Sequence, residues 1–207
     1  MKPLGKWLIA IAFAVALGLG GLLLVQRTWE KRWQGDVETI AASSLQGLRE
    51  QNRLSAFAAR FVAVVTSEQS RFGLSAKKTL IMPGMVRYEV DLSKLQQRDV
   101  AWDEVSRTLT VTLPPIEIAG PQVDMRAIEE YDGGGILLAL TDSEKVLDAA
   151  NRKAGQDELM RQAREAVPMK LARDATRRAI ANSFSMPLKA AGVEATVVAR
   201  FGDETGS

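Results

Sequence analysis

A serine and a lysine three positions apart come closest to a catalytic pair in this sequence. The stretch Ser75-Ala76-Lys77-Lys78 matches Ser-x-x-Lys, a pattern in which a lysine one helical turn from the serine helps to take its proton. The pattern needs a helix, whereas the neighbouring residues predict strands, and neither a Ser-Asp-Asn nor a Lys-Thr-Gly element accompanies it. Because two fixed positions also match by chance, a solvated turn is the simpler interpretation.

Acidic residues gather between Asp124 and Asp132, next to Gly133-Gly134-Gly135. Such carboxylates could hold a hard cation such as calcium or act as general acid and base. Their spacing matches no calcium loop, and the glycines lack the Gly-Lys-Ser/Thr end of a phosphate loop. A solvated acidic connection is the alternative. A hydrolase would need two carboxylates to converge in one cleft, from among Asp91, Asp103, Asp124, Glu129 and Asp132.

The sequence contains no histidine and no cysteine. Their absence excludes thiol nucleophiles, disulfides, iron–sulfur clusters and the usual histidine-based zinc and acid–base sites. We therefore expect no catalytic residue, no metal ligand and no cofactor. A binding or structural role is favoured over catalysis.

Two groups of residues are candidates for an interaction surface. Tyr88 and Trp102 are aromatic residues on expected strand faces, and a carboxylate follows each of them closely. Aromatic residues on strands are more often part of the core, and an aspartate there often ends the strand or caps the next turn. Two arginines of a late helix could meet anionic headgroups, or could form a solvated face paired with nearby acids. The candidates are Tyr88, Asp91, Trp102, Asp103, Arg173 and Arg177.

These side chains belong to a body that follows an apolar stretch at residues 7–25, from Trp7 to Val25. At about 1.5 Å per residue, this stretch forms a helix of roughly 28 Å, which is long enough to cross a bilayer core. Tryptophans and cations at both ends suit the headgroup regions. A cleaved signal peptide is the alternative, but its apolar part is usually shorter and ends at a small-x-small site. We expect a retained transmembrane helix after a tail of residues 1–6.

The orientation of this span is not decided by charge, because lysines and arginines are nearly balanced on its two sides. A short tail and a large C-terminal body insert most simply with the body outside the cytoplasm. We expect a single-pass protein of the bacterial inner (plasma) membrane with an extracytoplasmic body. The net charge of +2 comes from the flanks of the span. The slightly acidic body offers no electrostatic basis for binding nucleic acid.

One face of the expected span carries small side chains, because Ala10, Ala14 and Gly18 recur at four-residue spacing. Such a face permits close approach of a second helix in lipid. Small residues are also common in any span, so the sequence leaves self-association and a separate protein partner as alternatives.

Residues 26–53 show a helical period and predict an amphipathic stalk, which could lie on the body, on the membrane or against a second copy, or could be an exposed connector. Residues 54–201 have the length of one domain. The polar tail at 202–207 is expected to be disordered.

Strands come first in the body. Alternating apolar residues predict strands over residues 55–67 and 108–113, and two extended pieces between 79 and 92 separated by Pro83-Gly84. Residues 68–73 read as a turn. The pattern predicts a meander of antiparallel strands.

Helices follow, and a strand closes the domain. Thr141 and Glu144 form a capping box, Pro168 should kink the helical stretch or start a new helix, and Gly192 should end it. Alternation returns at residues 193–201. We therefore expect an α+β fold: an antiparallel meander sheet, C-terminal helices packed on one of its faces, and a final strand that returns to the sheet.

Three motifs occur together in the body: the pair Pro83-Gly84, the strand Tyr88-Glu89-Val90-Asp91-Leu92, and the strand end Leu113-Pro114-Pro115. With the intervening Val100-Ala101-Trp102-Asp103, this combination resembles a membrane-anchored bacterial family, domain of unknown function 4230. The likeness covers most of the body. It implies one N-terminal span and one extramembrane domain, and it carries no activity, cofactor or catalytic residue.

The sequence thus predicts a membrane-anchored binding or structural module of the bacterial envelope that acts through protein or lipid contacts. The alternative is an envelope hydrolase that uses carboxylates or the Ser75 and Lys78 pair. The two hypotheses differ in whether those side chains converge in a cleft.

Overall fold

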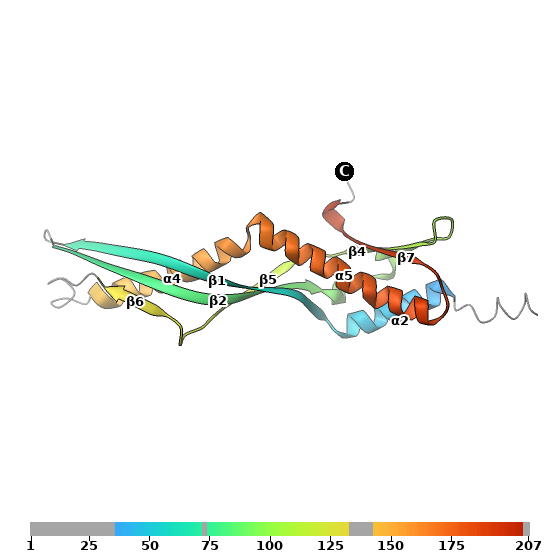
Figure 1. Cartoon of the computed structure of the whole chain (residues 1–207), viewed down its shortest axis with the longest axis horizontal. Helices are drawn as coiled ribbons and strands as arrows, with labels where there is room; N and C mark the ends of the chain where they lie inside the picture. Colours follow the sequence, from blue (N-terminus) through green and yellow to red (C-terminus); the bar gives the residue numbers. More distant parts are fainter. Residues whose placement is uncertain (1–35, 72–73, 133–142, 205–207) are drawn as a thin grey trace, which may run out of the picture.

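The computed structural model describes residues 36–71, 74–132 and 143–204 of the 207-residue chain. The molecule is elongated, with a long two-stranded hairpin at one end and a core of helices and a second sheet at the other (Figure 1). Among the described residues, no helix is long and apolar enough to cross a membrane. The expected span at residues 7–25, with its small-residue face and the preceding tail, lies outside the described residues.

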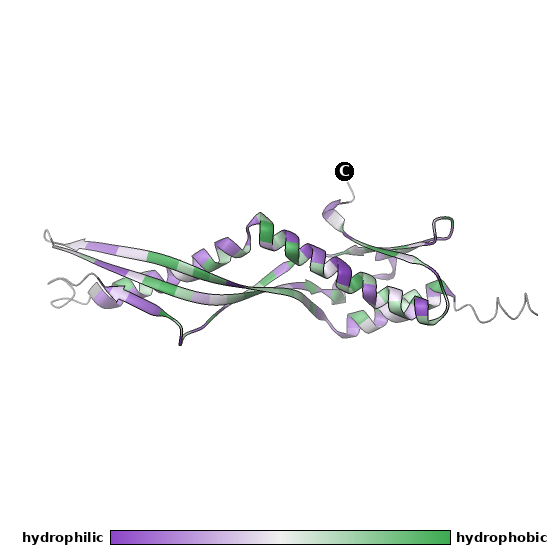
Figure 2. Cartoon of the chain, viewed as in Figure 1, coloured by the Kyte–Doolittle hydropathy of each residue, from purple (hydrophilic) through white to green (hydrophobic). Residues whose placement is uncertain are grey.

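The first sheet is built on the hairpin of β1 (Arg53–Arg71) and β2 (Leu74–Asp91), which pair in antiparallel fashion. Two short strands pair with the other edge of β2: β5 (Glu117–Val123) near the base of the hairpin and β6 (Glu129–Asp132) further out. Hydrophobic segments of β1 and β2 lie side by side in the middle of the hairpin (Figure 2). The register places β1 at the edge of this sheet.

Helix α4 (Ser143–Ala163) covers one face of the hairpin. Its approach is close because two glycines lie at the crossing. A Cβ atom on Gly84 would lie 2.8 Å from Leu159 Cδ1 of the helix, and one on Gly155 would lie 3.0 Å from Met82 Sδ of the strand. Gly84 therefore makes room for the helix, and the Pro-Gly pair forms no turn.

The second sheet lies at the core end. Its strands are β3 (Val100–Asp103), β4 (Thr108–Leu113) and β7 (Thr196–Phe201). β3 is antiparallel to β4, whereas β7 is parallel to it. Helices α5 (Ala166–Ala190) and α2 (Val37–Glu50) pack beside this sheet and against each other.

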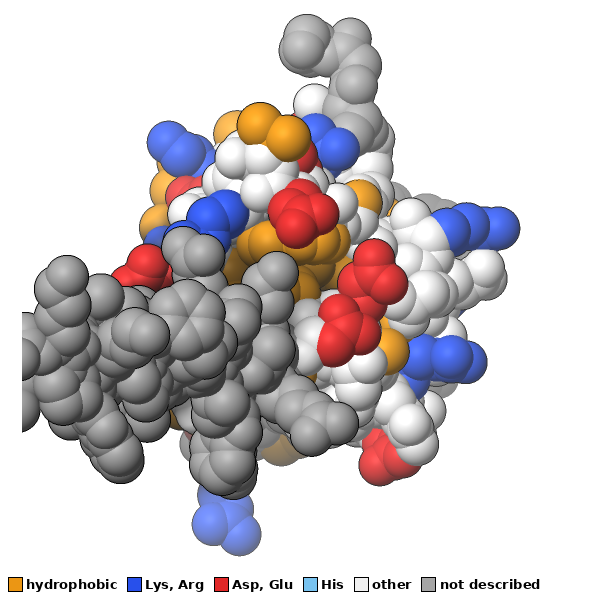
Figure 3. Space-filling view, turned by 90° about the vertical axis from the view of Figure 1, so that its right-hand side faces the viewer, with side chains coloured by type: hydrophobic (Ala, Val, Ile, Leu, Met, Phe, Trp, Pro, Cys, Tyr) orange, Lys and Arg blue, Asp and Glu red, His pale blue; other side chains and the backbone are white. Residues whose placement is uncertain are grey.

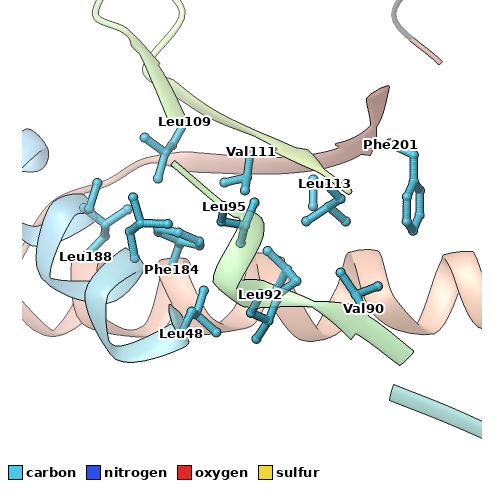
Figure 4. Close-up of a cluster of buried hydrophobic side chains, with 14 residues drawn as sticks. Leu48, Val90, Leu92, Leu95, Leu109, Val111, Leu113, Phe184, Leu188 and Phe201 are labelled. Carbon is cyan, nitrogen blue, oxygen red and sulfur yellow. The ribbon is translucent and has the colours of Figure 1, made fainter. Parts of the chain in front are cut away.

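The main hydrophobic core joins these elements (Figure 4). Helix α2 contributes Leu45 and Leu48, so residues 37–50 of the predicted helical stretch pack on the body. Helix α5 contributes a stripe at every fourth position, which is one face of a helix. Its buried residues are Ala172, Thr176, Ile180, Phe184 and Leu188.

Local signals fix the ends of α5. α4 ends at Ala163 and α5 begins at Ala166, so Pro168 lies in the first turn, where a missing N–H costs no hydrogen bond. At the other end, Gly192 has φ +75, its N–H donates to Lys189 O, and the Val193 N–H donates to Leu188 O. This is the Schellman arrangement expected of a terminal glycine.

The α+β prediction is confirmed in outline: an antiparallel sheet carries two C-terminal helices, and the last strand joins a sheet. Three details differ. The strands form two sheets instead of one meander, and β7 joins the second in parallel with β4. β1 continues to Arg71, through most of the expected turn.

The third difference is that β2 runs unbroken through Pro83-Gly84. The Asp124 N–H donates to Pro83 O, so the backbone of Pro83 faces away from β1. The nitrogen of Pro83 therefore faces the interval between β5 and β6. Neither strand has an acceptor paired there, so the lack of an N–H costs no hydrogen bond of the sheet.

Candidate functional site

The two aromatic candidates lie in different parts of the core. Tyr88 is fully buried, its hydroxyl donates to Ala163 O at 2.8 Å, and its ring centroid lies 5.4 Å from that of Phe57. Burial raises the pKa of this phenol. Trp102 is half-buried on β3 and packs against the core of the second sheet. The two side chains form no shared surface.

The two aspartates beside them shape local turns. Asp91 accepts hydrogen bonds from the Ser93 hydroxyl and N–H, and so caps a short 3-10 turn after β2. Asp103 accepts from the Ser106 hydroxyl and from the N–H of Val105 in the β3–β4 connection. These hydrogen bonds hold the pKa of both carboxyls below their usual range. Both carboxylates thus already accept hydrogen bonds within their own turns.

Arg173 and Arg177 lie together on α5 and face the end of the chain. Arg173 donates to Asp203 and Glu204, and its guanidinium lies 4.2 Å from the ring centroid of Phe201. Arg177 donates to Glu204 and to Asp174. Hydrogen bonding to Asp203 raises the pKa of Arg173, and hydrogen bonding to Arg173 lowers the pKa of Glu204. The structure brings this predicted pair together, but its partners are carboxylates of the same chain.

Ser75 and Lys78 lie on opposite faces of β2. Residues three apart on a strand point to opposite sides, and accordingly Ser75 is exposed whereas Lys78 is buried. The helical turn that a Ser-x-x-Lys pair requires does not exist here.

The buried Lys78 instead forms an ion cluster with partly exposed carboxylates of β6 and α4. Its Nζ lies 2.5 Å from Asp148 Oδ1, 2.8 Å from Glu130 Oε2 and 3.9 Å from Glu144 Oε1. Burial alone would lower the pKa of Lys78, but its hydrogen bonds to Asp148 and Glu130 outweigh burial and raise it. A lysine held in this charged state cannot act as a general base near neutral pH.

The remaining carboxylates are spread along one edge of the hairpin. Asp124 follows β5 and pairs with Arg60 at 3.4 Å. Glu129 accepts from the Tyr131 hydroxyl at 2.8 Å, and Asp132 is exposed at the end of β6. Within residues 36–71, 74–132 and 143–204, no three acidic side chains form a group that could hold a metal ion.

Among the described residues, part of the face of the hairpin opposite α4 stays exposed to solvent. Val62, Val64 and Met85 point to this face and are 49%, 61% and 45% exposed. Arg60 and Thr66 of β1 lie on the same side, since alternate residues of a strand share a face. This surface, the β1 outer face, is apolar in the middle and polar at both ends.

A groove of about 630 Å³ lies at the other end of the molecule, between the C-terminus of α5 and the start of β7. Figure 3 views this end and shows hydrophobic side chains between charged ones. Arg107 and Glu194 line the groove and pair at 3.7 Å. None of the residues proposed from sequence lines it. The full lining is Arg107, Ser185, Met186, Lys189, Val193, Glu194, Ala195 and Thr196.

Two features were missed from the sequence. Lys78 alternates with Ala76, Leu80 and Met82 on the covered face of β2, a pattern that marks a buried lysine once the strand is extended to Leu74. Alternation along β1 places Val62 and Val64 on one side of the strand, but the sequence does not say which side α4 covers. The tertiary contacts of α4 decide this.

Comparison with known proteins gives one match. Residues 46–198 match the family model described as protein of unknown function (DUF4230). No curated protein and no solved structure matched the chain. The matched region runs from the end of α2 into β7 and thus includes both sheets and both C-terminal helices. The chain therefore belongs to the DUF4230 family.

Proposed function

We propose that this protein is a single-span, membrane-anchored binding module of the bacterial envelope, with its body on the extracytoplasmic side. The observation that carries the proposal is the β1 outer face. It presents Val62, Val64 and Met85 to solvent on the one side of the hairpin that α4 leaves open. Contiguous exposed apolar side chains of this kind are typical of contact surfaces.

The arrangement of the chain suits an anchored module. Residue 36, where the described chain begins, lies at the end of the molecule opposite the tip of the hairpin (Figure 1). At about 3.3 Å per residue, a strand of the length of β1 spans about 60 Å. The bilayer is engaged by residues 7–25 in this proposal, and the hairpin presents its open face at a distance from the anchor.

The hydrolase alternative has little support from the geometry. Asp91, Asp103 and Asp124 lie at three separate places, each engaged in local hydrogen bonds. Ser75 and Lys78 face opposite sides of their strand. Catalysis by such groups needs at least two of them within reach of one substrate atom. We therefore propose that the protein acts by binding a partner and not by hydrolysis.

The membrane part of the proposal is tested with protease added to intact spheroplasts that express the full chain with a C-terminal tag. Digestion of the tag is expected. Protection that disappears only after lysis would contradict the extracytoplasmic placement. Release of the protein from membranes by alkaline carbonate would contradict the anchor.

The binding part is tested by placing a photo-crosslinking residue at Met85, on the β1 outer face, and separately at Val105, which is 96% exposed in the β3–β4 connection. Adducts in living cells are expected from position 85 and not from position 105. Adducts from neither position would contradict a binding function. Adducts from position 105 alone would move the contact surface to the core end.

A further inference from the structure

We infer that the outer edge of β1 pairs with the same edge of a second copy of this chain, in an antiparallel register centred on Val64. The inference deepens the proposed function and rests on it, because it names a second copy as the partner of the module and the edge of β1 as the place where that partner binds. Four observations on β1 carry it: the direction of its backbone groups, the composition of the strand, the charges at either side of Val64, and the position of Gln162.

The direction of the backbone follows from Pro83. Val62 is paired with Pro83, which has no N–H, and Pro83 O accepts from the Asp124 N–H on the other side of β2. The Val62–Pro83 pair is therefore a non-hydrogen-bonded pair, and the N–H and C=O of Val62 point away from β2. The register is regular beyond Phe57, so the N–H and C=O groups of every second residue also point away from β2. These residues are Arg60, Val62, Val64, Thr66 and Glu68.

No other strand within the described part of the chain pairs with this edge. The edge is long, since β1 spans 19 residues. Residues 61–67 contain no charge, no proline and no glycine. Soluble proteins normally interrupt such edges with charges, prolines or bulges because they invite pairing with another chain. The middle of β1 lacks these protections on the strand itself.

The charges on either side of Val64 are self-complementary. Arg60 lies four residues before Val64 and Glu68 four residues after it, and both are exposed on the uncovered face. When two β1 strands pair in antiparallel fashion with Val64 opposite Val64, Arg60 of each copy lies opposite Glu68 of the other. Opposite charges placed directly across two strands stabilise the pair. All of the residues so paired have outward-pointing backbone groups, as hydrogen-bonded pairs require.

A side chain of α4 already uses this edge. Gln162 Nε2 donates to Val62 O at 3.2 Å. This contact shows that the carbonyl of Val62 points away from β2, and the second lone pair of the oxygen remains for a strand. Because Gln162 is also bonded to Glu158 at 2.9 Å, its amide can leave the edge without losing all its partners.

The geometry of the pair has a consequence for the membrane. A two-fold axis through Val64 makes one continuous sheet in which the two hairpins run in opposite directions. The two α2 helices then lie at opposite ends of the assembly. Copies anchored in the same bilayer would lie along its surface, with the paired hairpins between the two anchors.

The decisive test is a charge exchange in the full-length protein, with its mass measured in detergent by light scattering. Arg60→Glu and Glu68→Arg are each expected to weaken dimerisation by about tenfold, and the double variant is expected to restore it. Eight residues of strand separate the two positions by about 26 Å, so restoration can only come from another copy. A monomeric wild-type protein, or a double variant as weak as the single variants, would overturn the inference.

A proline at position 64 tests the edge without disturbing the hairpin. The Val64 N–H points away from β2, so Val64→Pro removes no bond of the ladder and should keep the circular dichroism of the folded chain. Val65→Pro is the matched control, because its N–H faces β2 and its loss should unfold the hairpin. A Val64→Pro protein that is folded and still dimeric would contradict pairing through this edge.

Cross-linking in native membranes separates this inference from the broader function. The chain has no cysteine of its own, and paired residues on the axis lie within disulfide distance. Val64→Cys should form a disulfide dimer about tenfold faster than Val105→Cys, which is at the other end of the molecule. A disulfide to a different protein would overturn self-pairing and leave the binding function standing. Failure of the binding function itself would appear separately, as an absence of adducts from photo-crosslinking residues at both Met85 and Val105.

Discussion

The core end and the hairpin end bury their apolar side chains in different ways. At the core end, α2, α5 and the second sheet enclose Leu48, Phe184 and Phe201 (Figure 4). On the hairpin, α4 covers one face only, and Val62 and Val64 stay about half exposed on the other. The first arrangement stabilises the fold by complete burial, whereas the second leaves apolar side chains exposed to solvent. Substitutions at the two ends should therefore affect different properties.

The largest expected effect is at the core end. Phe184→Ala should lower the free energy of unfolding by about 3–5 kcal/mol, because it removes a fully buried ring and leaves a cavity. Val64→Thr, on the open face of the hairpin, should change it by less than about 0.5 kcal/mol. Denaturant unfolding of the full chain, followed by circular dichroism, measures both. Similar losses for the two variants would break the comparison.

The hairpin carries a buried lysine, Lys78, and the next prediction concerns it. Lys78→Met should cost about 1–2 kcal/mol, because the partly exposed carboxylates of Asp148 and Glu130 lose the charge that compensates them. The neighbouring Lys77→Met is the control, since Lys77 is exposed on the opposite face. The same denaturant measurement applies. If both lysine variants unfolded alike, the ion cluster would add nothing to the attachment of β6 and α4.

Two glycine substitutions are expected to change the stability of the chain in opposite directions. Gly84→Ala should destabilise the chain by about 1–2 kcal/mol, because the added methyl group meets Leu159 of α4. Gly47→Ala on α2 should stabilise it by about 0.5–1 kcal/mol, since a Cβ there meets nothing within 4 Å and alanine favours a helix. Melting temperatures of the two variants should move in opposite directions. A shift in the same direction would contradict close packing of α4 on β2.

The smallest expected effect is the response to acid, and both ends should show it. Arg173 lowers the pKa of Asp203 and Glu204 at the core end, and Arg161 lowers the pKa of Glu158 to about 2 on α4. A lowered carboxyl pKa contributes stability that is present above the ordinary values of 3.8 and 4.5 and is lost as the pH falls through the lowered value.

Arg173→Gln and Arg161→Gln should each flatten the decline in stability below about pH 4.5. Unfolding curves measured at intervals between pH 2 and pH 6 test this. The effect of each variant is expected to be independent of the other, because the two groups lie at different ends of the molecule. A steeper decline in either variant would contradict the assigned partners.

Much of the element order could be predicted from local sequence. The alternation in β1 and β4, the helix break before Pro168 and the helix end at Gly192 depend on the backbone preferences of a few neighbouring residues, and all were confirmed. The fold class followed from that order. The candidate surface residues were identified less well, because burial is a property of the assembled molecule and not of a short segment.

Three particular residues show this limit. Tyr88 can lie in the core because the carbonyl oxygen of Ala163, 75 positions later, accepts a hydrogen bond from its hydroxyl. Pro83 lies within a continuous strand because it falls between the residues of β2 that pair with β5 and those that pair with β6, where no N–H is needed. Arg173 donates a hydrogen bond to Glu204, 31 positions along the chain, so its positive charge is paired within the molecule. In each case the partner is distant in sequence, and no local pattern identifies it.

The sequence by itself determined the types and order of the elements, the membership of the family and the absence of thiol and imidazole chemistry. Only the tertiary structure decided that the strands form two sheets and that α4 covers one face of the hairpin. It also decided that no other described strand pairs with the outer edge of β1. The physical reason is that backbone preferences act between neighbours, whereas burial and strand pairing are set by which distant segments come into contact.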